Sequence, residues 1–125
     1  DVITPIIPLL KRGNNPNIIF IGSLAGIKNV GLSPSYTLAK SLTRGLVESW
    51  SSKLGEFDIK VNSIDPGLLD AGKGEFVPQK QREGYLKHCS LRRLGKPLEV
   101  ACIASWFVLN NSYVTGQSIL LDGGL

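Results

Sequence analysis

The segment YTLAK, residues 36–40, places a tyrosine four positions before a lysine. Side chains four residues apart on a helix share one face, so Tyr36 and Lys40 can point into the same cleft. A free tyrosine has a pKa of about 10 and is a poor acid or base at neutral pH. A nearby ammonium favours the phenolate and lowers that pKa, which suits a tyrosine to protonate an alkoxide or to deprotonate an alcohol. The same spacing also occurs in solvent-exposed pairs, so the surrounding elements must decide.

A third candidate, Ser23, follows the short apolar run IIFI at residues 18–21. Such a run, bounded by turn residues, predicts a strand that is buried on both faces of a parallel sheet. Ligands of open α/β sheets bind at the carboxyl ends of the strands, where Ser23 would lie. Its hydroxyl could hold the substrate oxygen that Tyr36 protonates, although a serine at this place is also a common turn residue.

The elements that must position these residues alternate along the chain. The pattern predicts strands at 18–21, 58–64 and 118–121, helices at 34–54 and 96–110, and a long loop with short helical pieces at 68–90. This order is typical of an α/β fold, and three strands amount to half of a doubly wound, Rossmann-type parallel sheet. Gly45 inside the first helix weakens it by roughly 1 kcal/mol relative to alanine, which suggests close packing there against another backbone.

Composition disfavours several functional classes. The net charge is +4, but the basic residues are scattered and form no patch of the kind that binds nucleic acid. No apolar run approaches the length of a membrane span, so we expect no membrane partner. Cys89, Cys102 and the lone His88 show no metal-ligand or redox spacing. We therefore expect no metal site, and two spare thiols favour a reducing compartment such as the cytoplasm.

Three further segments, KVNSIDPGLL, RRLGKPLEVA and YVTGQSILLDGG, follow Ser23 and YTLAK in order. With the thirteen-residue step from Ser23 to Tyr36, they resemble the C-terminal half of a short-chain dehydrogenase/reductase of the single-domain branch. The matching family features are the catalytic serine, Y-x-x-x-K, the strand end V-N-x-x-x-P-G, the loop into the next helix and the closing strand. The similarity covers about residues 17–125, and it predicts that residues 1–125 form the catalytic and substrate half of one Rossmann-fold domain.

The resemblance implies hydride transfer between a nicotinamide cofactor, NAD or NADP, and a small carbonyl or alcohol substrate. Tyr36 would be the general acid/base and would also contact the cofactor, and Ser23 would orient the substrate oxygen. Lys40 would lower the pKa of Tyr36 and bind the ribose hydroxyls of the nicotinamide half. The segment 70–90 would be the substrate loop.

The family pattern also implies cofactor contacts in the turn after the second strand. Pro66 and Gly67 would lie beside the nicotinamide, and the backbone of Leu69 would meet its carboxamide. This sequence departs from the pattern nearby. Asp65 stands where relatives have a small residue, which would bring a carboxylate unusually near the nicotinamide, and Ala71 stands where many have a cofactor-binding threonine. Gly22 replaces a common serine, with little chemical consequence expected.

The glycine-rich G-x-x-x-G-x-G turn of the family is absent from this sequence, and the family's catalytic asparagine would fall just before Asp1. We therefore expect a fragment whose partner is the N-terminal half of the same protein. The apolar residues around helix 34–54, including Trp50 and Leu54, predict a homodimer or homotetramer.

Two alternatives remain open from the sequence. A non-catalytic truncated piece or subunit-interaction module would have no need of Ser23, Tyr36 and Lys40 together. An epimerase or dehydratase of the extended branch also uses Y-x-x-x-K, but the ending LLDGGL disfavours it because that branch continues into a further substrate domain.

Overall fold

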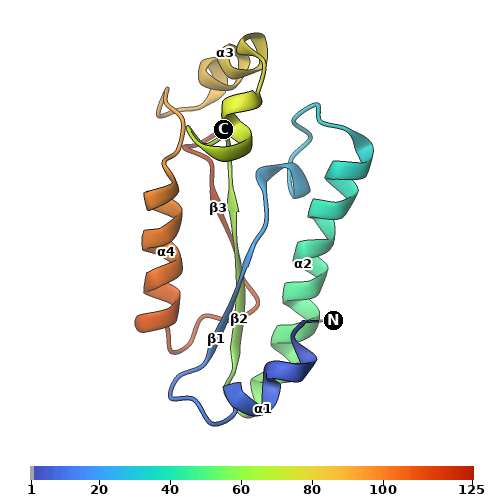
Figure 1. Ribbon diagram of the computed structural model, residues 1–125, viewed down its shortest axis with the longest axis vertical. Coiled ribbons are helices and arrows are strands. Elements are labelled where there is room, and N and C mark those ends of the chain that lie inside the picture. The colour runs from blue at the N-terminus through green and yellow to red at the C-terminus, as the bar shows by residue number, and fades with distance from the viewer. Residues whose placement is uncertain (1) are drawn as a thin grey trace.

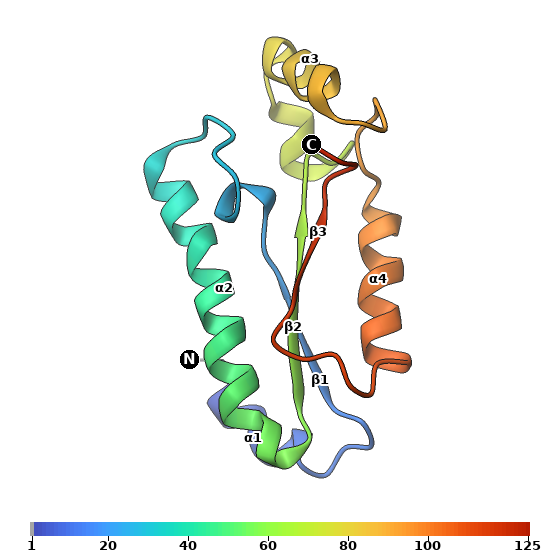
Figure 2. The ribbon, with the colours of Figure 1, turned by 180° about the vertical axis from the view of Figure 1, so that it is seen from behind.

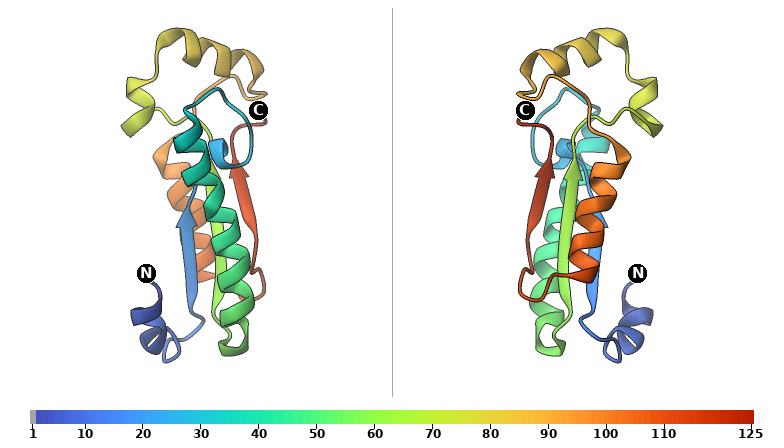
Figure 3. Two further views of the ribbon diagram at one scale, coloured as in Figure 1. Left: turned by 90° about the vertical axis from the view of Figure 1, so that its right-hand side faces the viewer. Right: turned by 90° about the vertical axis from the view of Figure 1, so that its left-hand side faces the viewer.

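The computed structural model describes residues 2–125, apart from the side chain of Lys73. Three strands, β1 (Asn17–Ile21), β2 (Lys60–Pro66) and β3 (Ser118–Leu121), form a parallel sheet in the order β1-β2-β3. Ile19 is paired with Asn62 across the first ladder, and Ser63 with Ser118 across the second. Figure 3 shows the three strands side by side and pointing the same way. The predicted α/β class and parallel sheet are thereby confirmed.

Two long helices cover opposite faces of this sheet (Figures 1 and 2). α2 (Pro34–Leu54) has the predicted bounds, and α4 (Pro97–Leu109) is one residue shorter at each end than predicted. Each begins with proline at its first position, where the missing N–H costs nothing. The Ser33 hydroxyl accepts a hydrogen bond from the amide of Tyr36 at 3.4 Å and caps α2. α2 therefore starts near the end of β1, with Tyr36 in its first turn.

The core lies on both faces of β2, which is buried along its whole length. Val47 and Leu54 of α2 and Phe107 of α4 are buried with 0–1% of their surface exposed. Leu54 is thus a core residue and Trp50 packs against the same cluster, so the expectation that these two side chains belong to an oligomer surface is wrong. An apolar segment at the start of the chain belongs to the same core. Its Ile3 has only 5% of its surface exposed and lies in one hydrophobic cluster with Leu54. It contains a 3-10 turn at Thr4–Ile6 and α1 (Ile7–Leu10).

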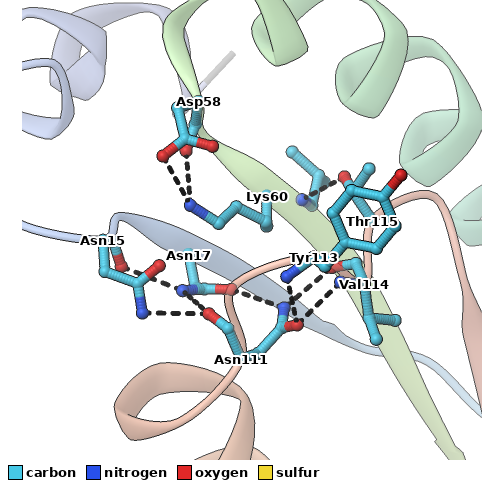
Figure 4. Close-up of polar contacts among 9 residues, drawn as sticks. Asn15, Asn17, Asp58, Lys60, Asn111, Tyr113, Val114 and Thr115 are labelled. Atoms are coloured by element: carbon cyan, nitrogen blue, oxygen red, sulfur yellow. Dashed lines mark hydrogen bonds and ion pairs between the residues drawn. The ribbon is translucent and has the colours of Figure 1, made fainter.

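A polar network stabilises the end of the sheet at which the strands begin (Figure 4). The side-chain amide of Asn111 donates to Asn17 Oδ1 at 2.9 Å, and its oxygen accepts from the amide of Val114 at 2.8 Å. Lys60 Nζ donates to the carbonyl of Asp58 at 2.8 Å and lies 3.0 Å from its carboxylate. Because buried polar groups need partners, this network stabilises the amino ends of the strands.

Two expectations need correction. The segment 68–90, predicted as a long loop with short helical pieces, contains a 3-10 turn at Gly72–Phe76 and a longer helix than expected, α3 (Gln79–His88), of ten residues. Gly45 was expected to pack against another backbone, but outside its own helical turn and chain neighbours no described atom lies within 4 Å of a Cβ built there. The close approach to α2 occurs at Gly26 instead, where a Cβ would lie 2.5 Å from the carbonyl oxygen of Lys40.

None of the described helices combines the length and the apolar character needed to cross a membrane.

Candidate active site

A groove of about 580 Å³ opens at the carboxyl end of the sheet. That volume falls in the range of small-molecule sites, roughly 300–1,000 Å³. The groove lies between the loop after β1, the first turn of α2, the turn after β2, and the segment that contains α3. Its lining includes five of the six predicted site residues, namely Ser23, Tyr36, Pro66, Gly67 and Leu69. Lys40 is not among the described residues that line it.

Ser23 is held at both its backbone and its side chain. Its amide donates to Asp65 Oδ1 at 3.1 Å, and its hydroxyl oxygen accepts from the amide of Ala25 at 3.3 Å. The second bond caps a 3-10 turn at Leu24–Gly26. A serine hydroxyl has one proton to donate and two acceptor positions, so this cap leaves the proton available for a ligand in the groove.

Tyr36 and Lys40 lie one turn apart on α2, and both side chains are partly buried. The ammonium of Lys40 lies 6.0 Å from the centroid of the Tyr36 ring. The loop that carries Ser23 can pass so close to this turn because residue 26 is glycine. Gly26 is thus a positional requirement of the site that the sequence pattern did not single out.

The turn after β2 is fixed by its neighbours in the fold. The amide of Gly67 donates to the carbonyl of Leu121 at 2.9 Å, and Leu69 forms a parallel bridge with Gly95. A Cβ at residue 67 would overlap the hydroxyl of Tyr85 and approach the Cα of Asp122 at 2.9 Å. Glycine is therefore required here for close packing.

Tyr85 lines the groove, and sequence reasoning missed it. Its hydroxyl donates to the carbonyl of Asp122 at 2.7 Å, and burial raises its pKa above the ordinary value of 10.0. Cys89, fully buried at the end of α3, donates through Sγ to the carbonyl of Gly123 at 3.3 Å. Together these contacts attach α3 to the segment after β3. The local sequence shows no apolar periodicity that would have predicted them.

Asp122 connects the same segment to the loop after β1. Its carboxylate lies 3.1 Å from Lys28 Nζ, and it accepts from the amide of Gly124 at 2.9 Å. Burial alone would raise the pKa of Asp122, but these two donors outweigh it and hold the pKa below the ordinary value of 3.8. Lys28 also donates to the backbone carbonyl of Leu125. Hydrogen bonds and an ion pair thus connect the loop after β1 and α3, which border the groove, to the segment after β3.

Gly22 has a steric consequence that the sequence did not predict, and this consequence involves Asp65. Asp65 is not among the described groove-lining residues, and its side chain is buried with 3% of the residue exposed. Its Oδ1 faces the Ser23 amide, and a Cβ at residue 22 would overlap that oxygen. Glycine at 22 is therefore required by the aspartate at 65, and the two departures from the family pattern are one structural feature.

Comparisons with known proteins agree with this arrangement. A family described as "Enoyl-(Acyl carrier protein) reductase" matches residues 1–125. A 3-oxoacyl-[acyl-carrier-protein] reductase of Thermotoga maritima is 33% identical over 126 residues, which cover 100% of this chain and 51% of that protein. The dehydrogenase/reductase SDR family member 4 of Mus musculus is 28% identical, covering 98% of this chain and 45% of its own. The chain thus spans about half the length of these relatives.

Solved structures give the same result for the fold. A 3-oxoacyl-[acyl-carrier protein] reductase from Brucella melitensis with bound NAD superposes with a TM-score of 0.79 at 31% identity, over 98% of this chain and 44% of that one. A 7α-hydroxysteroid dehydrogenase complexed with NADH and 7-oxo glycochenodeoxycholic acid gives a TM-score of 0.87 at 27% identity. The match covers 95% of this chain and 48% of that one. The three strands and their helices therefore correspond to half of a Rossmann-type domain, and the chain belongs to the short-chain dehydrogenase/reductase family.

Proposed function

We propose that this chain supplies the catalytic half of an NAD- or NADP-dependent oxidoreductase that transfers hydride between the nicotinamide and a carbonyl or alcohol. The observation that supports this most directly is the groove that both Ser23 and Tyr36 line. It lies at the carboxyl end of a parallel sheet, where ligands of α/β folds bind, in a member of an oxidoreductase family.

The proposed roles follow from the chemistry of each side chain. Tyr36 donates its hydroxyl proton to the carbonyl oxygen during reduction and takes a proton from the alcohol in the reverse direction. Ser23 donates a hydrogen bond to the same oxygen, since its own acceptor side already binds the Ala25 amide. Lys40, whose ammonium lies 6.0 Å from the ring of Tyr36, favours by Coulomb attraction the tyrosinate that forms when the proton leaves.

The residues present fit a nicotinamide cofactor on the open side of the groove. Pro66, Gly67 and Leu69 provide an uncharged wall beside Tyr36, and the volume of about 580 Å³ is large enough for a planar ring together with a small substrate. When bound there, the cofactor supplies or accepts the hydride. Lys40 would hold the ribose hydroxyls, and the backbone of Leu69 would meet the carboxamide. Either NAD or NADP is compatible with these contacts.

The walls of the groove also define a substrate class. None of the described residues that line it carries a charge at neutral pH; aside from the hydroxyls of Ser23, Ser33, Tyr36 and Tyr85 and the amide of Gln81, the side chains are apolar or glycine. An ionised group placed against such walls loses its hydration and gains no counter-charge. We therefore infer an uncharged, largely apolar carbonyl or alcohol substrate.

Two partners belong to this proposal. The first is the N-terminal half of the same protein, because residues 1–125 lack a glycine-rich turn for the pyrophosphate and, among the described residues, β1 is paired on one edge only. The second is another copy of the protein in a homodimer or homotetramer. Leu38, Leu42 and Leu46 form an apolar strip on α2 and are 45–64% exposed. Two free thiols, Cys89 and Cys102, fit a reducing compartment such as the cytoplasm.

The deciding experiment compares two tyrosine variants of the chain assembled with an N-terminal half. Oxidation of NADH and NADPH is followed with a neutral ketone, and cofactor binding is measured separately. Tyr36→Phe should lower kcat by at least about 10³-fold, in line with the loss of a positioned acid, and leave cofactor affinity within about threefold. Tyr113→Phe is the matched control, because Tyr113 is 94% exposed at the opposite end of the sheet.

Equal turnover by both variants would refute the role of Tyr36. Absence of turnover in the unmodified assembly with both cofactors would instead favour the alternative of a non-catalytic module.

A further inference from the structure

The carboxylate of Asp65, at the end of β2, lies between the end of the sheet and the loop that carries Ser23. Its Oδ1 accepts from the Ser23 amide at 3.1 Å, and its Oδ2 accepts from the Ser63 hydroxyl at 2.9 Å. The Ser63 hydroxyl lies 2.8 Å from that of Ser118 on β3. Both carboxylate oxygens therefore have partners, and the buried charge connects β2 and β3 to the loop after β1.

Residue 22 and the Asp65 carboxylate compete for one space. A Cβ at residue 22 would overlap Oδ1 and lie 3.0 Å from Cγ of Asp65. Any larger residue at 22 would force the carboxylate to rotate, and rotation would break its bonds to Ser23 and Ser63 together. Glycine at 22 is therefore a condition for the carboxylate to reach the Ser23 amide.

This arrangement fixes the hydroxyl of Ser23 from two sides. The backbone is held by a charge-assisted hydrogen bond, which is stronger than one between neutral groups. The side chain is held by the bond from the amide of Ala25 at 3.3 Å. The hydroxyl is thereby held in a residue that lines the groove, as Tyr36 does.

We propose that Asp65 is a positioning residue for Ser23, acting through the Ser23 amide, and that it acts only while residue 22 is glycine. The placement of Ser23 stands on the contacts alone, whereas its value for turnover rests on the proposed function.

The first test measures amide hydrogen exchange by NMR in the chain assembled with an N-terminal half. Asp65→Ala should raise the exchange rate of the Ser23 amide by about tenfold or more, since one hydrogen bond is lost. The neighbouring amide of residue 22, which donates to the carbonyl of Ile64 at 2.9 Å, is the internal reference and should change less than about twofold. Asp65→Asn keeps an acceptor oxygen for Ser23 and should stay within about threefold of the unmodified chain.

A second pair of variants tests whether the carboxylate must also lie in the right place. In these variants Asp65 is retained but displaced, or is absent. Gly22→Ala should raise Ser23 exchange as much as Asp65→Ala does, because the methyl displaces Oδ1. In the double variant, Gly22→Ala should add nothing to Asp65→Ala. If Asp65→Ala does not fold, Asp65→Ser replaces it, since the shorter side chain withdraws the acceptor from the amide. Unchanged Ser23 exchange in the folded Asp65 and Gly22 variants would overturn the proposal.

The kinetic test uses the assembled enzyme and distinguishes positioning from general destabilisation. Asp65→Ala should lower kcat about as much as Ser23→Ala, with KM for the cofactor within about threefold, and the double variant should equal Ser23→Ala alone. Additive losses would show that Asp65 serves stability only, which would overturn the positioning role. If the assembly turns over no carbonyl at all, the proposed function fails, while amide exchange still decides whether Asp65 holds Ser23.

Discussion

The hydroxyl of Tyr85 donates a 2.7 Å hydrogen bond to the backbone carbonyl of Asp122 and so joins α3 to the segment that follows β3. The two residues lie 37 positions apart in the chain. Tyr85 also lines the groove, so the same side chain both holds α3 in place and forms part of the wall that a substrate would touch. The position of α3 over the carboxyl end of the sheet is visible in Figure 1.

Tyr85→Phe should loosen α3 while it keeps the aromatic ring. We expect a loss of about 0.5–1.5 kcal/mol in the free energy of unfolding, the usual net value of one hydrogen bond. In the assembled enzyme, KM for the carbonyl substrate should rise more than kcat falls, because the wall moves while Tyr36 stays in place. Urea unfolding and steady-state kinetics measure the two effects, with Tyr113→Phe as the exposed control. A larger loss in kcat than in KM would argue against a role in shaping the groove.

Acid should weaken the connection made by Asp122. Its pKa is lower in the folded chain than the ordinary value of 3.8, so the folded state binds its proton less readily than the unfolded state does. Its stabilising effect is therefore complete above the unfolded pKa and is lost as the pH falls through the folded pKa. Asp122→Asn should lower stability by roughly 1–2 kcal/mol at pH 7, since the lysine partner is partly exposed, and should flatten the acid limb of the stability profile.

The control for this measurement is Glu48→Gln. Glu48 pairs with Arg44 at 3.1 Å, but both side chains are more than 60% exposed. A pair on the helix surface contributes only about 0.3–0.5 kcal/mol, so its removal should barely change the curve. Equal effects of Glu48→Gln and Asp122→Asn would show that burial of Asp122 has no energetic consequence.

The features that could be predicted from the sequence are those that depend on neighbouring residues in the chain. The bounds of α2 follow from three- and four-residue apolar spacing and from the cap made by Ser33 and Pro34. The alternation of strands and helices follows from the apolar patterns, and the place of Ser23 at the groove follows from the rule that ligands of parallel sheets bind at the carboxyl ends of the strands.

The remainder depends on contacts between residues far apart in the chain. α3 has no apolar period and is held by Tyr85 and Cys89 against residues more than 30 positions away. Gly22 and Asp65 looked like two separate departures from the family pattern, because nothing local shows that one occupies the space of the other. The prediction for Gly45 was wrong because glycine in a helix suggested close packing against another backbone, and the described chain places none there.

The uncharged walls of the groove predict selectivity between two ketones of the same shape. Pentan-2-one and 4-oxopentanoate share the same carbon positions and differ only in a terminal methyl or carboxylate. The assembled enzyme should show a kcat/KM at least about tenfold higher for pentan-2-one, because the carboxylate would lose hydration against apolar side chains. Initial rates of NADH or NADPH oxidation provide the measurement. Preference for the acid would require a cation within the groove and would overturn the inferred substrate class.

The apolar strip on α2 predicts self-association. Leu42, at the centre of the strip, is 60% exposed. A two-fold contact would bring the same strip from two copies together. Leu42→Glu should place like charges within that contact and shift the protein toward monomer in sedimentation at micromolar concentration. Ser41→Glu adds the same charge about 100° around the helix and should change the equilibrium much less. An unmodified protein that sediments as a monomer would refute the interface itself.

Residues 1–125 alone should bind NADH and NADPH negligibly, although they contain Tyr36 and Lys40. A dinucleotide needs a glycine-rich turn and a helix N-terminus for its pyrophosphate, and this sequence has no such motif. The chain offers only the nicotinamide side through the turn at residues 66–69. Titration of reduced cofactor, followed by its fluorescence, should therefore give no saturation up to about 100 µM, whereas addition of an N-terminal half should restore micromolar binding. Saturable micromolar binding by the chain alone would mean that the pyrophosphate contacts are not required and that the site is divided differently between the two halves.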